Sequence, residues 1–142
     1  MIAVTIYFYR NRFLQYAFQK SDVLCNFDAN HGWSNKNIYN SPTIQQLPKE
    51  VYLAKMAETE NPYVLDIRTR MEYNRGHVEG SQSMSVIGNS FDEKIELLDT
   101  TRTVFVYCET AHRSPFATMK LKRMGFTRIY DLKGGYMTLR EN

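Results

Sequence analysis

Strand-like and helix-like segments alternate from about Ile44 onward, and this order restricts the fold more than any other feature of the chain. The strongest strand pattern is Thr103 to Tyr107, a continuous run of β-branched and aromatic residues. Such a run is typical of a strand that is covered on both faces. Strands that alternate with helices over about 100 residues indicate a parallel sheet wrapped by helices. We therefore expect an α/β fold.

Shorter apolar runs predict further strands, at Tyr63 to Ile67, Ser83 to Val86 and Arg128 to Leu132. Pro48 suits the first turn of a helix that runs to about Glu58. We expect Val51 and Met56 to face inward from this helix.

Capping residues mark the remaining helices. Thr69 followed by Glu72 is a capping box, and Gly76 ends that short helix. Ser90 followed by Glu93 is a second capping box. The helix that it opens should bury Phe91, Ile95 and Leu98.

The helix after the strongest strand has its own start and stop signals. Ser114 is expected to cap it, Pro115 lies in its first turn, and Gly125 follows its end. A Gly134-Gly135 pair and a final helical turn follow the last strand.

The N-terminal segment has a different character. Residues 1–40 are predicted to be an extension of unknown role, and residues 41–142 the folded domain. Tyr9, Phe13 and Tyr16 recur at helical spacing, which predicts a helix from about Thr5 to Lys20. This aromatic helix predicts a contact with the domain or with a second copy of the chain, that is, a homodimer.

Composition excludes several classes of protein. The chain has 142 residues, of which 43% are hydrophobic and 23% charged, as expected for one globular domain. A net charge of +3 without a basic stripe argues against nucleic-acid binding. The apolar run Ile2 to Tyr9 is too short to span a membrane. Cys25 and Cys108 form neither a disulfide framework nor a zinc pattern, so we expect a reducing, cytoplasmic location and no metal or cofactor.

Cys108 is the strongest candidate for chemistry. It lies between the strongest strand and a helix start, with Arg113 closing the loop between them. Backbone amides, a helix N-terminus and a guanidinium group all favour a thiolate. A lone cysteine at a strand end is usually a small buried hydrophobic residue, but this setting makes Cys108 a candidate nucleophile.

Residues around Cys108 are candidates for binding a substrate. The loop residues are Glu109, Thr110, Ala111, His112, Arg113 and Ser114. Asp66 and Arg68 follow another strand, and ligands of parallel sheets bind beyond the carboxyl ends of the strands. These two residues either line the pocket or form a buried ion pair that fixes the turn. His112 either donates to a bound anion or faces solvent.

Motifs spread from about Leu47 to Leu139 resemble the rhodanese-like (sulfurtransferase) family. They are Val64-Leu65-Asp66-Ile67-Arg68, Glu72-Tyr73, Gly76-His77-Val78-Glu79-Gly80, Val106-Tyr107-Cys108 with its loop to Arg113-Ser114, and Leu132-Lys133-Gly134-Gly135. The resemblance implies a five-stranded parallel sheet with helices on both faces. It also implies that Cys108 accepts a sulfane sulfur as a persulfide from a small or protein-borne donor, such as thiosulfate, and passes it to a thiophilic acceptor.

Loop length separates this interpretation from its rivals. Dual-specificity phosphatases of the same fold carry Cys-x5-Arg, whereas this chain has the shorter Cys-x4-Arg of sulfurtransferases. A phosphatase or arsenate reductase is therefore disfavoured. A binding or regulatory module that has lost turnover is the other alternative.

Two residues depart from the common loop, Cys-Arg-x-Gly-x-Arg. Ala111 stands where glycine is common, and a lost glycine costs about 1 kcal/mol if the backbone requires a positive φ. Glu109 stands where a basic residue is common, and its carboxylate is expected to face the pocket and oppose thiosulfate. Poor thiosulfate activity is the resulting prediction.

Overall fold

The computed structural model describes residues 38–39, 41–88 and 90–140. The chain divides into two units, Met1–Ser34 and Asn35–Asn142, and every described residue belongs to the second. The helix expected from Thr5 to Lys20, its contact with the domain or a second copy, and Cys25 lie outside the described residues. Ile38 and Tyr39, which the sequence assigns to the extension, pack against the core of the domain.

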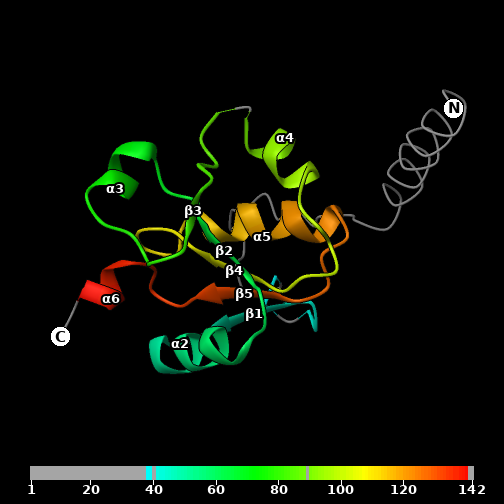
Figure 1. Ribbon diagram of the computed structural model, residues 1–142, viewed down its shortest axis with the longest axis horizontal. Helices are drawn as coiled ribbons and strands as arrows, with labels where there is room; N and C mark the ends of the chain where they lie inside the picture. Colours follow the sequence, from blue (N-terminus) through cyan, green and yellow to red (C-terminus); the bar gives the residue numbers. More distant parts are fainter. Residues whose placement is uncertain (1–37, 40, 89, 141–142) are drawn as a thin grey trace, which may run out of the picture. The chain divides into compact units, whose positions relative to one another are not determined.

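Five parallel strands form the centre of the domain, in the order β1-β5-β4-β2-β3 (Figure 1). The strands are β1 (Ile44–Leu47), β2 (Tyr63–Asp66), β3 (Gln82–Ser83), β4 (Val104–Tyr107) and β5 (Ile129–Leu132). The helices are α2 (Lys49–Glu58), α3 (Arg70–Asn74), α4 (Ser90–Glu96), α5 (Ser114–Arg123) and α6 (Met137–Arg140). The predicted parallel α/β sheet is confirmed.

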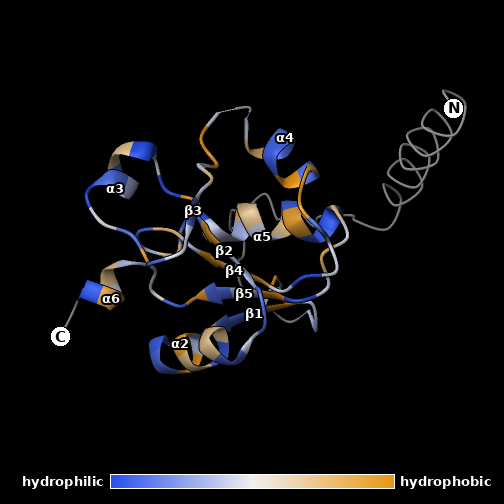
Figure 2. Ribbon diagram, in the orientation of Figure 1, coloured by the Kyte–Doolittle hydropathy of each residue, from blue (hydrophilic) through white to orange (hydrophobic). Residues whose placement is uncertain are grey.

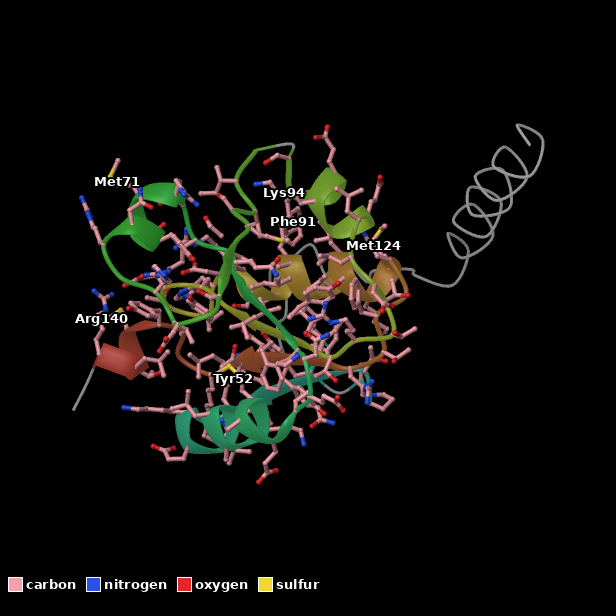
Figure 3. All side chains as sticks on the ribbon, in the orientation of Figure 1. Tyr52, Met71, Phe91, Lys94, Met124 and Arg140 are labelled. Atoms are coloured by element: carbon pink, nitrogen blue, oxygen red, sulfur yellow. The ribbon has the colours of Figure 1, made fainter. Side chains whose placement is uncertain are left out.

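Helices cover both faces of the sheet because its central strands carry apolar side chains in both directions. All residues of β2 and β4 are buried. Val64, Phe105 and Tyr107 face α2, while Leu65 and Val106 face the side of α4 and α5. Figure 2 shows the central strands as predominantly hydrophobic and the small helix α3 as predominantly hydrophilic. Tyr52 and Phe91 point from α2 and α4 toward the sheet (Figure 3).

Three local predictions need correction. Tyr52, not Val51, is the buried residue of α2, and Val51 is 49% exposed; Met56 packs on the core as expected. Strand β3 is only Gln82–Ser83, although the N–H groups of Met84 and Val86 still donate to the Asp66 and Ile67 carbonyls. Helix α5 has Arg113 at its N-cap, without a side-chain cap bond, and Ser114 is instead a buried residue of its first turn.

The signals at Thr69 and Gly125 are confirmed, whereas Pro48 is the N-cap of α2 and Ser90 is the first residue of α4 itself. Thr69 accepts a hydrogen bond from the backbone N–H of Glu72 (3.3 Å), and the Glu72 carboxylate accepts one from the Thr69 N–H (2.8 Å). Gly125 follows the C-cap of α5 with φ +100°. Because the strands are parallel, the segments after β2, β4 and β5 meet at one edge of the sheet, the carboxyl edge.

Among the described residues, none of the helices has the length and hydrophobicity that a bilayer-spanning segment requires.

Candidate active site

Cys108 directly follows β4 at the carboxyl edge, and its side chain is fully buried. The Ser114 hydroxyl donates a hydrogen bond to its sulfur over 3.4 Å, and Ser114 is buried as well. Since these residues are separated by the whole loop, the contact shows that the two ends of the loop meet at the sulfur. A hydroxyl donor of this kind stabilises a thiolate.

Backbone amides of the loop provide unused donors. The N–H groups from Glu109 to Ser114 have no hydrogen-bond acceptor among the described residues. The Cys108 carbonyl, by contrast, accepts from the Tyr136 N–H (2.7 Å), and the Glu109 carbonyl accepts from the Met137 N–H (3.1 Å). The loop thus has its first two carbonyls satisfied and its donors available, which suits an anion on or near the sulfur.

Gly135 makes this arrangement possible. Its φ is +71°, and a Cβ atom there would lie 2.6 Å from the carbonyl oxygen of Cys108 and from backbone atoms of Glu109. Only glycine allows the segment before α6 to approach the loop so closely.

Ala111 has a φ of +61°. The left-handed conformation costs a residue with a Cβ atom roughly 1–2 kcal/mol. The condition that the sequence left open, a positive φ at this position, is therefore met, and the loop carries local strain.

Arg113 is held by Glu72 at the start of α3. Its guanidinium donates to both carboxylate oxygens, over 2.6 and 3.0 Å. Hydrogen bonds from Arg113, and then from Thr69, lower the pKa of Glu72 to about 2, whereas partial burial acts in the opposite direction. The pKa of Arg113 is raised mainly by Glu72, with a smaller contribution from Cys108. Arg113 therefore links the loop to α3.

Asp66 and Arg68 form the buried ion pair that the sequence offered as one alternative. Arg68 is 2% exposed, and its guanidinium donates to Asp66 over 2.7 Å. The same guanidinium donates to the Gly76 carbonyl (2.6 Å) and lies over the Tyr136 ring. The pair fixes the turn between β2 and α3.

Glu109 is not the uncompensated carboxylate that the sequence predicts. Its carboxylate accepts from Arg68 over 2.8 Å and from Arg140. Figure 3 shows Arg140 on the C-terminal helix α6. Two guanidinium groups therefore compensate its charge. The prediction that Glu109 repels anionic donors is wrong for this paired carboxylate.

A cavity of about 260 Å³ opens beside the loop. Its lining residues are Arg68, Glu72, Arg75, Gly76, Glu109, Tyr136 and Arg140. The sequence did not single out Arg75, Tyr136 or Arg140, although the last two lie just beyond the Gly-Gly pair that the motifs include.

The other polar residues of the loop face outward. Thr110 and His112 are exposed, and the Thr110 hydroxyl lies 2.8 Å from Nδ1 of His112. Within the described part of the chain, no group of three or more His, Cys, Asp or Glu side chains is arranged to hold a metal ion.

A family comparison agrees with this geometry. The model of the rhodanese-like domain matches residues 49–142, so the chain belongs to the rhodanese-like domain family. The match includes the loop, Asp66, Arg68 and the segment that packs on the loop.

Relatives and solved structures point the same way. The chain is 26% identical to the uncharacterized protein YqhL of Bacillus subtilis, over 70% of this chain and 75% of that protein. It is 28% identical to the thiosulfate sulfurtransferase GlpE of Shewanella oneidensis, over 63% of this chain and 86% of the relative. A crystal structure of the Alr3790 protein from Anabaena sp. matches with a TM-score of 0.58 at 25% identity, over 66% of this chain and 75% of the other.

One group of relatives is much longer. The chain is 31% identical to the tRNA uridine(34) hydroxylase of Buchnera aphidicola, over 56% of this chain but only 27% of that protein. Family membership is therefore shared by proteins with different names and lengths.

Proposed function

We propose that the protein is a sulfurtransferase that carries a sulfane sulfur as a persulfide on Cys108. The Cys108 thiolate attacks the outer sulfur of the donor, so that a new S–S bond forms. With thiosulfate as donor, its own S–S bond breaks and sulfite leaves with the bonding electron pair. A thiophilic acceptor such as cyanide then attacks the outer sulfur, forms thiocyanate and releases the thiolate.

The observation that carries this proposal is the surrounding of the sulfur. Cys108 belongs to the buried apolar cluster of the sheet, as a structural cysteine would. It differs from a structural cysteine in that a hydroxyl donor, loop amides without acceptors and the Arg113 guanidinium lie near it. These groups match a thiolate and an anionic persulfide. Relatives named thiosulfate sulfurtransferase and putative sulfur carrier protein support the same chemistry.

Because the charge of Glu109 is paired, it does not exclude an anionic sulfur donor. The adjacent cavity is lined by more cations than anions, three arginines (Arg68, Arg75 and Arg140) against two carboxylates. An anionic donor or acceptor therefore fits there. Small sulfur anions and protein-borne persulfides are the proposed partners. A reducing compartment such as the cytoplasm suits the free thiol.

One observation favours the alternative of a binding or regulatory module. The Cys108 side chain has no exposed surface, and strain at Ala111 lies within the loop that covers it. A donor therefore reaches the sulfur only when the loop moves.

Thiocyanate formation from thiosulfate and cyanide distinguishes these functions. Cys108→Ser should reduce turnover to background, because oxygen is nearly isosteric with sulfur but forms no persulfide. Cys25→Ser is the matched control and should retain the wild-type rate. Equal rates in wild type and Cys108→Ser would refute the proposed mechanism, and no turnover in the wild type would support the regulatory module.

A further inference from the structure

Asp131 is a buried acid that the proposed sulfur chemistry does not use. It lies in β5, where its sheet partners are Val106 of β4 and Gln46 of β1. Side chains alternate between the two faces of a strand, so Asp131 shares a face with Val106 and with Cys108, two residues farther along the chain. The carboxylate therefore lies on the same face of the sheet as the Cys108 sulfur, beside Val106, which is two residues before Cys108.

Neighbouring groups fix one side of this carboxylate. The Tyr39 hydroxyl donates to Oδ2 over 2.5 Å, and the Gln46 side chain donates to the same oxygen over 3.1 Å. The second oxygen, Oδ1, is buried and has no hydrogen-bond partner among the described residues. A buried carboxylate oxygen without a donor is costly.

The Ser114 hydroxyl is a donor close to this carboxyl group, although it does not bond to Oδ1. The interaction of its hydroxyl with Asp131 lowers the pKa of the carboxyl. The single hydroxyl proton is nevertheless directed to the sulfur of Cys108. One donor thus lies near two possible acceptors, the sulfur of Cys108 and the carboxylate of Asp131, and both residues are buried.

We propose that Asp131 is a positioning residue that governs the ionisation of Cys108, by competing with its sulfur for the hydroxyl proton of Ser114. An ionised Asp131 draws this donor from the sulfur and places a second negative charge nearby. A protonated Asp131 leaves the donor to the thiolate. The inference rests on the proposed function for its importance in catalysis, but the coupling itself is a property of the thiol.

The groups near Asp131 come from several elements. Tyr39 before β1, Gln46 in β1 and Ser114 in α5 interact with the carboxylate, and Cys108 after β4 lies on the same face of the sheet. Tyr52 of α2 packs on the opposite face and interacts with Asp131 electrostatically. Burial raises the pKa of both tyrosines above their usual range. Burial also raises the pKa of Asp131 to about 6, so the carboxylate is ionised at neutral pH.

The test is the pH dependence of Cys108 alkylation by iodoacetamide in the full-length chain, followed by peptide mass spectrometry. Asp131→Asn should lower the midpoint of this profile, so that alkylation at pH 7 becomes at least about threefold faster, since only the thiolate reacts. In a Ser114→Ala background, Asp131→Asn should shift the midpoint by less than half as much. Circular dichroism verifies that each variant folds.

A second variant and a second readout keep the test decisive. Tyr39→Phe removes a donor from Asp131, raises the pKa of that carboxyl and should shift the thiol midpoint in the same direction, even if Asp131→Asn fails to fold. The ultraviolet absorbance of the thiolate, taken as the difference from Cys108→Ser, gives the midpoint without access of a reagent. Unchanged midpoints in the folded variants would overturn the inference. Because neither readout involves sulfur transfer, absent turnover with a shifted midpoint would refute only the proposed function.

Discussion

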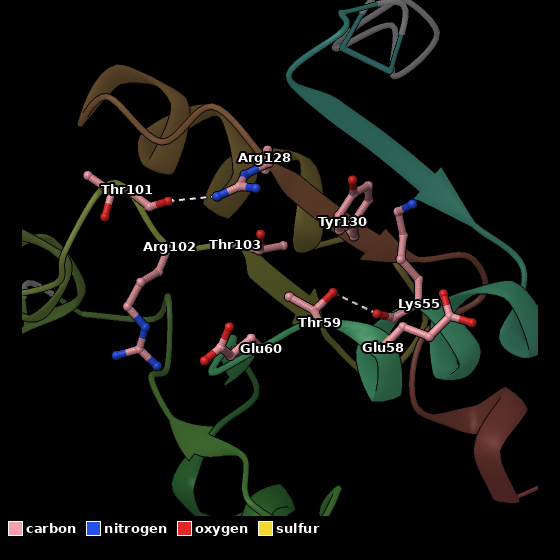
Figure 4. Close-up of a pocket in the computed structure, with 9 residues that line it drawn as sticks. All are labelled: Lys55, Glu58, Thr59, Glu60, Thr101, Arg102, Thr103, Arg128 and Tyr130. Carbon is pink, nitrogen blue, oxygen red and sulfur yellow. Dashed lines mark hydrogen bonds between the residues drawn. The ribbon is translucent and has the colours of Figure 1, made fainter.

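The two edges of the sheet both carry arginine residues, but these residues are used differently. At the amino edge, a cavity of about 530 Å³ lies where β4 and β5 begin (Figure 4). Its nine lining residues are Lys55, Glu58, Thr59, Glu60, Thr101, Arg102, Thr103, Arg128 and Tyr130. Arg102 donates to the Asn61 carbonyl (2.8 Å) and Arg128 to the Thr101 carbonyl (2.9 Å).

At the carboxyl edge, arginine residues pair with carboxylates that belong to other segments. Arg113 joins the loop to Glu72, and Arg68 joins the turn after β2 to Glu109. These pairs hold the loop while its backbone amides remain without acceptors. The larger cavity is thus not the candidate active site; loop amides without acceptors beside a buried cysteine, rather than volume, distinguish the carboxyl edge.

Neutralising one arginine at each edge should give the largest difference. Arg113→Gln removes the ion pair with Glu72 and should lower kcat/KM for sulfur transfer by about tenfold to a hundredfold, because a charge-assisted hydrogen bond is worth about 1.5–3 kcal/mol. Arg128→Gln at the amino edge should leave kcat/KM unchanged. Steady-state kinetics measure both. Equal losses would show that the edges do not differ in function.

Removing one carboxylate at each edge should have a smaller effect. Glu109→Gln leaves Arg68 and Arg140 without their shared partner, so thiosulfate should bind more tightly, with KM about two- to fivefold lower at low salt. Glu58→Gln makes the same change of charge at the amino edge and should not alter KM. The difference in KM between Glu109→Gln and wild type should decrease as ionic strength rises. An unchanged KM for Glu109→Gln at low salt would mean that the donor does not pass the cavity beside the loop.

Acid should weaken the Arg113–Glu72 link. The pKa of Glu72 in the folded state is about 2, below its ordinary value of 4.5. A lowered folded-state pKa means that the link contributes its full stability above pH 4.5 and loses it as the pH falls toward 2. Glu72→Gln should therefore lose less of its thermal stability than wild type between pH 5 and 2.5. Calorimetry at several pH values measures this, and parallel losses would contradict the role of Glu72.

Relief of strain at Ala111 should be the smallest effect. Ala111→Gly removes the left-handed penalty of a Cβ atom but makes the unfolded chain more flexible, so the net gain should be about 0.5 kcal/mol. Ala54→Gly inside α2 is the matched control, because Ala54 is exposed on a helix and its replacement should cost about 1 kcal/mol. Urea unfolding measures both. A loss of stability in Ala111→Gly would contradict the strain in the loop.

Features that depend on neighbouring residues were predictable from the sequence. The order of strands and helices and the capping box at Thr69 follow from local patterns, and the structure confirms them. For Ala111 the sequence indicated only the consequence of a positive φ, and the structure shows that φ is positive. The position of Cys108 after a buried strand follows in the same way.

Features that depend on distant residues were not predictable. The sequence predicts that Glu109 repels anions, because no local pattern reveals its partners. Arg68 lies 41 residues away, and Arg140 lies in the last helix. Ser114 matched the pattern of a helix cap, but its hydroxyl is directed to the sulfur of Cys108. Asp131 could have been found from the sequence, since it is the one charged residue of the apolar strand β5.

The central claim is that Cys108 carries sulfur, and the intact mass of the protein after incubation with thiosulfate tests it most directly. We expect a gain of about 32 Da, one sulfur atom, that dithiothreitol removes and that peptide mapping assigns to Cys108. Cys25→Ser should show the same gain and Cys108→Ser none. No gain in the wild type with thiosulfate or a low-molecular-weight persulfide, or a gain that persists in Cys108→Ser, would contradict the account.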